Sequence, residues 1–136
     1  MDKLKGLDLE EKLVLDAGTG GCNMTRYLSE WGAEVISVDY RPDWQKQCRD
    51  IIDKTQFITA DLGNMPFFKS EIFDYVICNF VVSALSESKS LLISSPLREF
   101  YRILKKNGML VVIDYQPFIK DVSSCKLDDV QIELWK

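Results

Sequence analysis

The fold is decided by the stretch Leu13-Val14-Leu15-Asp16-Ala17-Gly18-Thr19-Gly20-Gly21-Cys22-Asn23-Met24. It opens with an apolar run that is too short for a helix and is closed by glycines, which is typical of a buried parallel strand. Asp16 stands where this strand ends. The glycines that follow permit a sharp turn, because glycine adopts a positive φ without a Cβ clash.

A helix is expected directly after this turn. Met24, Tyr27, Leu28 and Trp31 recur at helical spacing, and Gly32 provides a stop. The free backbone N–H groups of the helix's first turn form a site for a carboxylate or a phosphate. We therefore expect a flat, charged ligand to lie across the glycine turn.

The same alternation of strand and helix continues along the chain. Further strands are expected at 34–39, 57–60, 73–78 and 109–113, and helices at 42–52 (with Pro42 at its first position), 83–93 and 95–106 (with Gly108 just past its end). The first 12 residues allow at most one marginal helix, and 130–134 reads as one strand, an antiparallel edge. The pattern predicts an α/β fold in one domain, residues 1–136: a doubly wound, mostly parallel sheet with helices on both faces.

Composition excludes several classes of function. A net charge of −4 and a pI near 4.9 argue against nucleic-acid binding, and no apolar run is long enough to cross a membrane. The 4 cysteines form no C-x-x-C pair, which favours reduced, buried thiols in a cytoplasmic protein and no metal site. The chain has no histidine, so mechanisms that need an imidazole are excluded.

Polar residues follow the expected strands. They are Asp16, Asp39, Asp61, Asn79 and Asp114. Each alone is an ordinary solvated strand end, but the carboxyl ends of parallel strands meet at one edge of a sheet, where α/β folds bind ligands. Together these residues are expected to line one crevice.

The spacing around the turn favours one kind of nucleotide. A carboxylate at Asp39, at the end of the second strand, can accept hydrogen bonds from both hydroxyls of a ribose, in NAD proteins and in nucleoside-sulfonium proteins alike. A G-x-G-x-x-G dinucleotide turn that starts at Gly18 would need glycine at position 23, where the chain has Asn23. Asp16 is badly placed for a pyrophosphate and suits a ligand with an ammonium or sulfonium.

The motifs in this order resemble the class I S-adenosylmethionine-dependent methyltransferases. Residues 13–20 are similar to the family's first motif, 34–40 to its second, and 60–67, 73–79 and 104–110 to the motifs of later strands. By pattern, the small-molecule enzymes of the ubiquinone-biosynthesis type are the most similar. The resemblance runs from Leu13 to Asp114 and implies S-adenosyl-L-methionine as the cofactor and a small-molecule methyl acceptor.

The resemblance also implies roles for individual residues. Asp16 and the backbone of Gly18, Thr19 and Gly20 would hold the methionine moiety, Asp39 the ribose, and Asp61 the adenine amino group, with Tyr40 and Leu62 beside the adenine ring and Asn79 and Phe80 near the transferred methyl. Ordinary packing is the alternative for Tyr40 and Leu62. Catalytic residues stay unassigned, and Asp114 and Tyr115 are the only late-strand candidates for a general base.

Departures from the family pattern leave alternatives open. Cys22 stands at the third motif glycine, and residues 79–82 lack the N-P-P-[YF] motif of nucleic-acid amino-methyltransferases. Only residues 115–136 follow the fifth strand, so part of the family's C-terminal antiparallel strand pair is expected to be missing, or the substrate site to be completed by a second copy or a partner protein. The alternatives are a non-catalytic or partner-dependent S-adenosylmethionine-binding subunit and, less favoured, a nicotinamide-dependent oxidoreductase.

Overall fold

The computed structural model describes residues 2–51, 56–79, 81, 94–114 and 131–135, and strands alternate with helices through most of this part of the chain. The strands are β1 (Leu13–Ala17), β2 (Glu34–Asp39), β3 (Gln56–Thr59), β4 (Phe73–Asn79), β5 (Leu104–Ile113) and β6 (Gln131–Trp135). The helices are α1 (Asp2–Lys5), α2 (Asn23–Glu30), α3 (Pro42–Ile51) and α5 (Ser94–Ile103). The helix expected at 83–93 lies outside the described residues.

The strands form one six-stranded parallel sheet in the order β3-β2-β1-β4-β5-β6. The chain moves outward from β1 to β3, returns to place β4 on the other side of β1, and then moves outward again. Strand order therefore reverses between β1 and β4, which is where a doubly wound sheet opens a crevice beyond the carboxyl ends of its strands. The expected fold class is confirmed.

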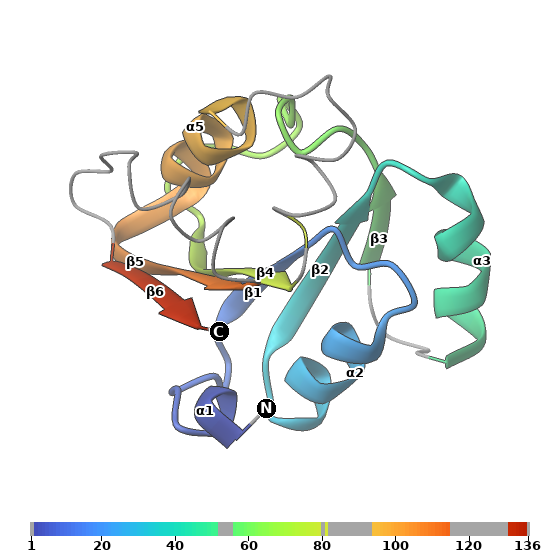
Figure 1. Ribbon diagram of the computed structural model, residues 1–136, viewed down its shortest axis with the longest axis horizontal. Coiled ribbons are helices and arrows are strands. Elements are labelled where there is room, and N and C mark those ends of the chain that lie inside the picture. Colours follow the sequence, from blue (N-terminus) through green and yellow to red (C-terminus); the bar gives the residue numbers. More distant parts are fainter. Residues whose placement is uncertain (1, 52–55, 80, 82–93, 115–130, 136) are drawn as a thin grey trace.

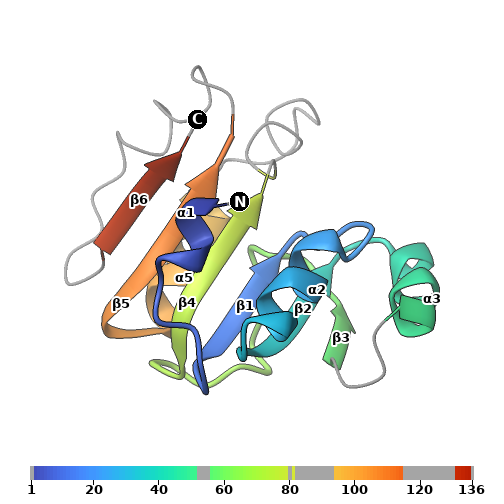
Figure 2. The same cartoon turned by 90° about the horizontal axis from the view of Figure 1, so that it is seen from below.

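Helices cover both faces of the sheet. Figures 1 and 2 show α5 on one face and α1 and α2 on the other. Alternate residues of one strand serve the two cores: Val14 packs in the cluster beneath α1 and α2, and Leu15 in the cluster beneath α5. None of the helices in the described ranges is long and apolar enough to cross a membrane.

Helix α2 ends as its sequence predicts. Gly32 adopts a φ of 88°, and the N–H groups of Gly32 and Ala33 donate to the carbonyls of Ser29 and Leu28, at 3.1 Å each. This is the Schellman arrangement, in which a glycine just past the helix end lets the chain reverse. The expected start of α3 at Pro42 is also confirmed.

Two predictions about the C-terminal half are wrong. β6 pairs with β5 in a parallel direction and is not an antiparallel edge strand. Helix α5 ends at Ile103, several residues before the position expected from Gly108, because Leu104 already pairs with Phe73 and is buried. Pairing within the sheet overrides the local signals for a helix end.

Candidate functional site

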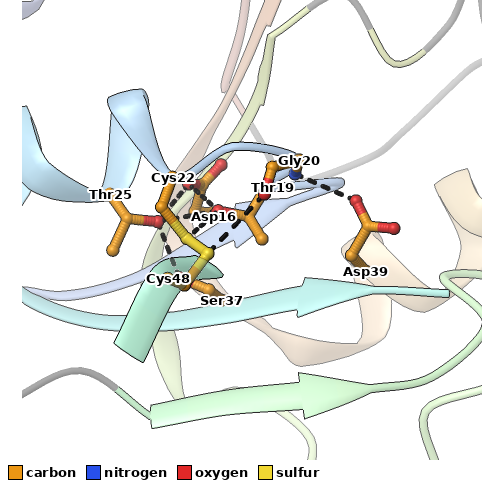
Figure 3. The surroundings of a disulfide bond; sticks show 8 residues. All are labelled: Asp16, Thr19, Gly20, Cys22, Thr25, Ser37, Asp39 and Cys48. Carbon is orange, nitrogen blue, oxygen red and sulfur yellow. Dashed lines mark hydrogen bonds between the residues drawn. A yellow bond between two sulfur atoms is a disulfide. The ribbon is translucent and has the colours of Figure 1, made fainter. Parts of the chain in front are cut away.

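The glycine turn is hydrogen-bonded to the end of β2. The N–H groups of Gly18 and Thr19 donate to the carbonyl of Val38 at 2.7 and 3.2 Å. The N–H of Gly20 donates to Oδ2 of Asp39 at 3.0 Å, as Figure 3 shows. The Arg41 N–H donates to the other carboxylate oxygen at 3.0 Å. Asp39, which is 7% exposed, thus lies against the turn, as its place at a strand end predicts.

Gly18 is required by its backbone and by its neighbour. Its φ is 73°, in the left-handed region that L side chains rarely adopt. A Cβ at this position would lie 2.5 Å from a methyl carbon (Cγ2) of Val81, the residue that closes over the turn after β4. The turn can therefore keep this close contact only with glycine at position 18.

Asp16 lies beneath the turn in a buried cluster of hydroxyl groups. The Thr19 hydroxyl donates to Oδ2 of Asp16 at 2.7 Å, and the Thr25 hydroxyl donates to the same oxygen. The Ser37 hydroxyl lies 2.7 Å from that of Thr25 and donates to it, because the Thr25 proton is already directed at Asp16. The backbone N–H of Thr25, in the first turn of α2, also donates to the Asp16 carboxylate. The carboxylate of Asp16 therefore occupies part of the anion site expected at this helix terminus.

Burial raises the pKa of the Asp16 carboxyl above its usual range, because the charged form loses its water. The hydrogen bonds from Thr25 and Thr19 oppose the increase in pKa, and the negative charge of Asp39 adds to it. A cationic group brought to this end of the turn would favour the charged carboxylate. The electrostatics of the turn thus suit a ligand that carries a positive charge.

Two other predicted residues follow the carboxyl ends of β2 and β3. Tyr40 directly follows β2 and is 73% exposed, so its ring is open to a ligand or to solvent. Asp61 follows β3 and is also exposed, and its Oδ1 accepts a hydrogen bond from the Gly63 N–H at 2.8 Å. Leu62, in contrast, is buried in the core beneath α5.

The remaining predicted residues belong to β4 and β5. Asn79 is the last residue of β4 and is half-buried, beside the end of β1. Asp114 follows β5 and is buried. Phe80 and Tyr115 lie outside the described residues. The structure thus brings Asp16, the glycine turn and Asp39 into contact, and it places Asn79 and Asp114 at the same edge of the sheet.

The loop that carries Asp61 and Leu62 is fixed to α5 by an ion pair. Glu99 accepts the Met65 N–H at 2.7 Å and pairs with Nε of Arg102 at 2.8 Å. Arg102 also donates to the carbonyls of Phe68 and Met65, at 2.7 and 2.9 Å. Hydrogen bonds from Arg102 lower the pKa of the Glu99 carboxyl. The loop is therefore held by charge-assisted hydrogen bonds at several points.

A disulfide joins Cys22 to Cys48, with 5.6 Å between their Cα atoms. Figure 3 shows it beside the glycine turn. The prediction that these two cysteines are reduced is wrong, because α3 brings Cys48 against the turn, a contact that spacing along the chain does not reveal. Cys78 is free and buried, and Cys125 lies outside the described residues.

Sequence reasoning missed Thr25, Ser37 and the Glu99–Arg102 pair. One signal for Ser37 was present in the sequence. Ser37 is two residues after Val35, so it shares the strand face that packs beneath α1 and α2. A serine on such a buried face needs a hydrogen-bond partner. No comparable signal marks Glu99 and Arg102, since charged residues on a helix usually face solvent.

Comparison with known proteins identifies the family. The sequence pattern of a family described as a methyltransferase domain matches residues 15–112, which is more than half of the chain. The chain belongs to this methyltransferase family. The match begins inside β1 and ends inside β5, so it includes every element of the sheet except β6.

Curated relatives and solved structures of this methyltransferase domain agree with the match. The chain is 31% identical over 97 residues to malonyl-[acyl-carrier protein] O-methyltransferase of Salmonella typhimurium, covering 71% of the chain and 36% of the relative. It is 29% identical over 121 residues to a ubiquinone/menaquinone biosynthesis C-methyltransferase of Pectobacterium carotovorum, covering 82% and 46%. A TehB-like SAM-dependent methyltransferase structure from Corynebacterium glutamicum superposes with a TM-score of 0.71 at 19% identity, covering 89% and 68%, which shows the shared fold. The chain spans less than half the length of the curated relatives named here.

The arrangement of this methyltransferase domain can bind and align a ligand. It offers carboxylates at the turn, a half-buried amide at Asn79 and no imidazole, because the chain has no histidine. Within the described residues, no group of three or more cysteine or carboxylate side chains is arranged to hold a metal ion. A site of this composition suits chemistry in which the ligand is already activated.

Proposed function

We propose that the chain binds S-adenosyl-L-methionine and transfers its methyl group to a small-molecule acceptor. The observation that carries the proposal is the contact of Asp39 with the glycine turn at the point where strand order reverses. A carboxylate there can accept both ribose hydroxyls, and Asp16 beneath the same turn favours a cationic end. Membership of the methyltransferase family supports a methyl donor as the cofactor, and the name of the ubiquinone/menaquinone biosynthesis relative supports a small acceptor.

In this proposal each residue has a limited task. The turn from Gly18 to Gly20 admits the methionine part because Gly18 has no Cβ, and Asp16 orients its ammonium. Asp39 holds the ribose, Tyr40 flanks the adenine, and Asp61 accepts a hydrogen bond from the adenine amino group. Asn79 and Phe80 stand on the acceptor side, and Leu62, which is buried in the core, supports the loop that carries Asp61. The cofactor supplies an activated methyl group on a sulfonium. The protein's contribution is therefore alignment and exclusion of water, and no general base is assigned.

In a second candidate function, the chain binds the cofactor at the same site but does not transfer its methyl group by itself. The chain spans less than half the length of the curated relatives named above, and elements that cover the acceptor in a methyltransferase could come from a second copy or from another protein. In that case the chain binds S-adenosylmethionine but transfers its methyl group only with a partner. A methyl-transfer assay on cell extract, with and without added partner fractions, separates the two candidates.

Calorimetric titration with S-adenosylmethionine, S-adenosylhomocysteine and NAD tests the site itself. We expect both sulfur nucleosides to bind and NAD not to bind. Asp39→Ala should weaken their binding by about 1–3 kcal/mol, because the ribose hydroxyls lose a charged acceptor. The control is Asp8→Asn, an exposed carboxylate in the segment before β1. Unchanged affinity in a folded Asp39→Ala variant, or binding of NAD alone, would contradict the proposal.

A further inference from the structure

We propose that Cys22 and Cys48 form a reversible dithiol–disulfide site, with a low-molecular-weight thiol as its reaction partner, and that the disulfide form binds the nucleoside more tightly. The inference rests on the proposed function, because it concerns the same nucleoside site. It adds a reaction of the protein's own side chains to that site.

The disulfide links the two segments that frame the turn and Asp39. Cys22 is the residue before α2, where the turn ends, and Cys48 belongs to α3, which follows Asp39 along the chain. The cross-link spans 26 positions in sequence. Sγ of Cys48 also lies 3.6 Å from the carbonyl oxygen of Gly20, so α3 contacts the turn at a second point.

Few of the described side chains of helix α3 attach it to the rest of the molecule. Figure 2 shows it at the edge of the molecule, beyond β3. Among the described side chains of α3, only Cys48 is buried, and Trp44 is half-buried with its ring against Gly21. Breaking the disulfide would leave Trp44, of the side chains that the structure describes on α3, in contact with the turn.

Cys22 itself has an unfavourable backbone conformation. Its φ is 66° and its ψ is 15°, in the left-handed region that residues with a Cβ rarely adopt. The bond to Cys48 restrains Cys22 in this conformation at the end of the turn, two residues after the Gly20 N–H that donates to Asp39. Without the bond the turn gains freedom, and a ligand that needs this arrangement must order it again, which lowers affinity.

The reaction is thiol–disulfide exchange. A small thiolate attacks Sγ of Cys48, the S–S bond breaks, and its electron pair leaves on Sγ of Cys22. Cys48 is the expected point of attack, because it lies on the outer helix and is 5% exposed against 1% for Cys22. A second small thiolate then releases Cys48, so two thiols become one disulfide, and their two protons end on the cysteines. The departing Cys22 thiolate is stabilised by the N-terminus of α2, which begins at the next residue.

The test compares S-adenosylhomocysteine binding to the full chain in its two redox forms. One sample is oxidised, with the Cys22–Cys48 peptide pair verified by mass spectrometry, and the other is reduced by excess dithiothreitol. We expect affinity to be about tenfold lower in the reduced sample, because the turn and α3 are ordered only on binding. Cys48→Ser should bind like the reduced protein in both conditions, and Cys125→Ser should keep the redox response.

The outcomes separate this inference from the proposed function. Equal affinity in both redox forms, or tighter binding after reduction, overturns the redox inference and leaves the nucleoside site in place. Absence of binding in both forms, with a folded chain by circular dichroism, overturns the proposed function and the redox inference with it. The wild-type comparison needs no substitution, so it decides the matter even if Cys48→Ser does not fold.

Discussion

The carboxyl of Asp16 is buried beneath the turn, and burial raises its pKa. A folded-state pKa above the unfolded value means that the folded chain binds the proton more tightly. The corresponding contribution to stability is present below the unfolded pKa and is lost as pH rises through the folded pKa. At neutral pH the charged form of this single residue therefore opposes folding.

Asp16→Asn should change how stability depends on pH. Because the amide does not ionise, we expect the free energy of unfolding of the variant, relative to wild type, to increase by about 1–3 kcal/mol between pH 4 and pH 8. Urea denaturation at several pH values measures this difference. The matched control is Asp43→Asn, an exposed carboxylate on α3 that should follow wild type. Parallel profiles of Asp16→Asn and wild type would show that Asp16 is not the residue that titrates.

Residues of the turn were predicted from local rules. The expectation that Asp39 and the glycine turn line one crevice follows from strand ends that share an edge, whereas the hydrogen bond between them comes from the structure. Thr25 and Ser37 could not be placed in the same way, because their contact with Asp16 depends on how α2 packs over β1 and β2. The hydrogen-bond partners of polar residues inside a core can be identified only when the packing of the helices on the sheet is known.

The loop from Asp61 to Phe68 and helix α5 act as one element. The loop has no strand of its own, and its backbone groups at Met65 and Phe68 are satisfied by Glu99 and Arg102. A buried backbone group that loses its partner costs free energy comparable to a lost hydrogen bond. The position of Asp61, at the start of this loop, therefore depends on an ion pair on α5.

Arg102→Ala should lower the free energy of unfolding by about 2–3 kcal/mol at pH 7, because Glu99 and two carbonyl groups lose their partners. The decrease in the free energy of unfolding that Arg102→Ala causes should become smaller as pH falls. Arg102 lowers the pKa of Glu99, so this contribution is present above the ordinary glutamate pKa and is lost as pH falls through the lower folded value. Urea denaturation at neutral and acidic pH checks both points. Arg98→Ala, an exposed arginine on the same helix, is the control, and an equal loss in both variants would contradict the role of Arg102.

Within the described residues, strands and helices followed the predicted periodicity up to the junction of α5 and β5. There the sequence Lys105-Lys106-Asn107-Gly108 has the pattern that is typical of a helix C-terminus, but these residues lie within β5. Asn107 has a φ of 62°, and a Cβ at Gly108 would lie 2.8 Å from the carbonyl oxygen of Lys105. Glycine is needed here for a close backbone approach, which sequence alone does not distinguish from a helix cap.

Across the whole molecule, the sheet separates two apolar cores, and Cys78 lies in the core beneath α5, on the central strand β4. Burial raises the pKa of the Cys78 thiol, and the charges of Asp16 and Asp114 raise it further. The thiolate of Cys78 is therefore scarce as long as the sheet is intact. A doubly wound sheet with helices on both faces was predictable at this scale, because repeated strand–helix units permit few topologies.

Thiol labelling should distinguish local from global opening. In the reduced protein we expect a maleimide to label Cys48 faster than Cys78, because α3 can open without disturbing the sheet. Cys78 should react only through global unfolding, at a rate that increases with urea in step with the unfolding equilibrium. Peptide mass mapping assigns each site. Labelling of Cys78 at the rate of Cys48 would show that the centre of the sheet opens as readily as its edge.

The contact between Gly18 and Val81 links two positions far apart in the chain. A methyl group at position 18 has no room while valine occupies position 81, whatever the backbone tolerates. Smaller side chains at 81 would relieve the steric conflict, and the left-handed conformation at 18 would then be the sole obstacle. A substitution at Gly18 therefore requires a smaller residue at position 81 first. The two positions form an epistatic pair, both in natural divergence and in engineering.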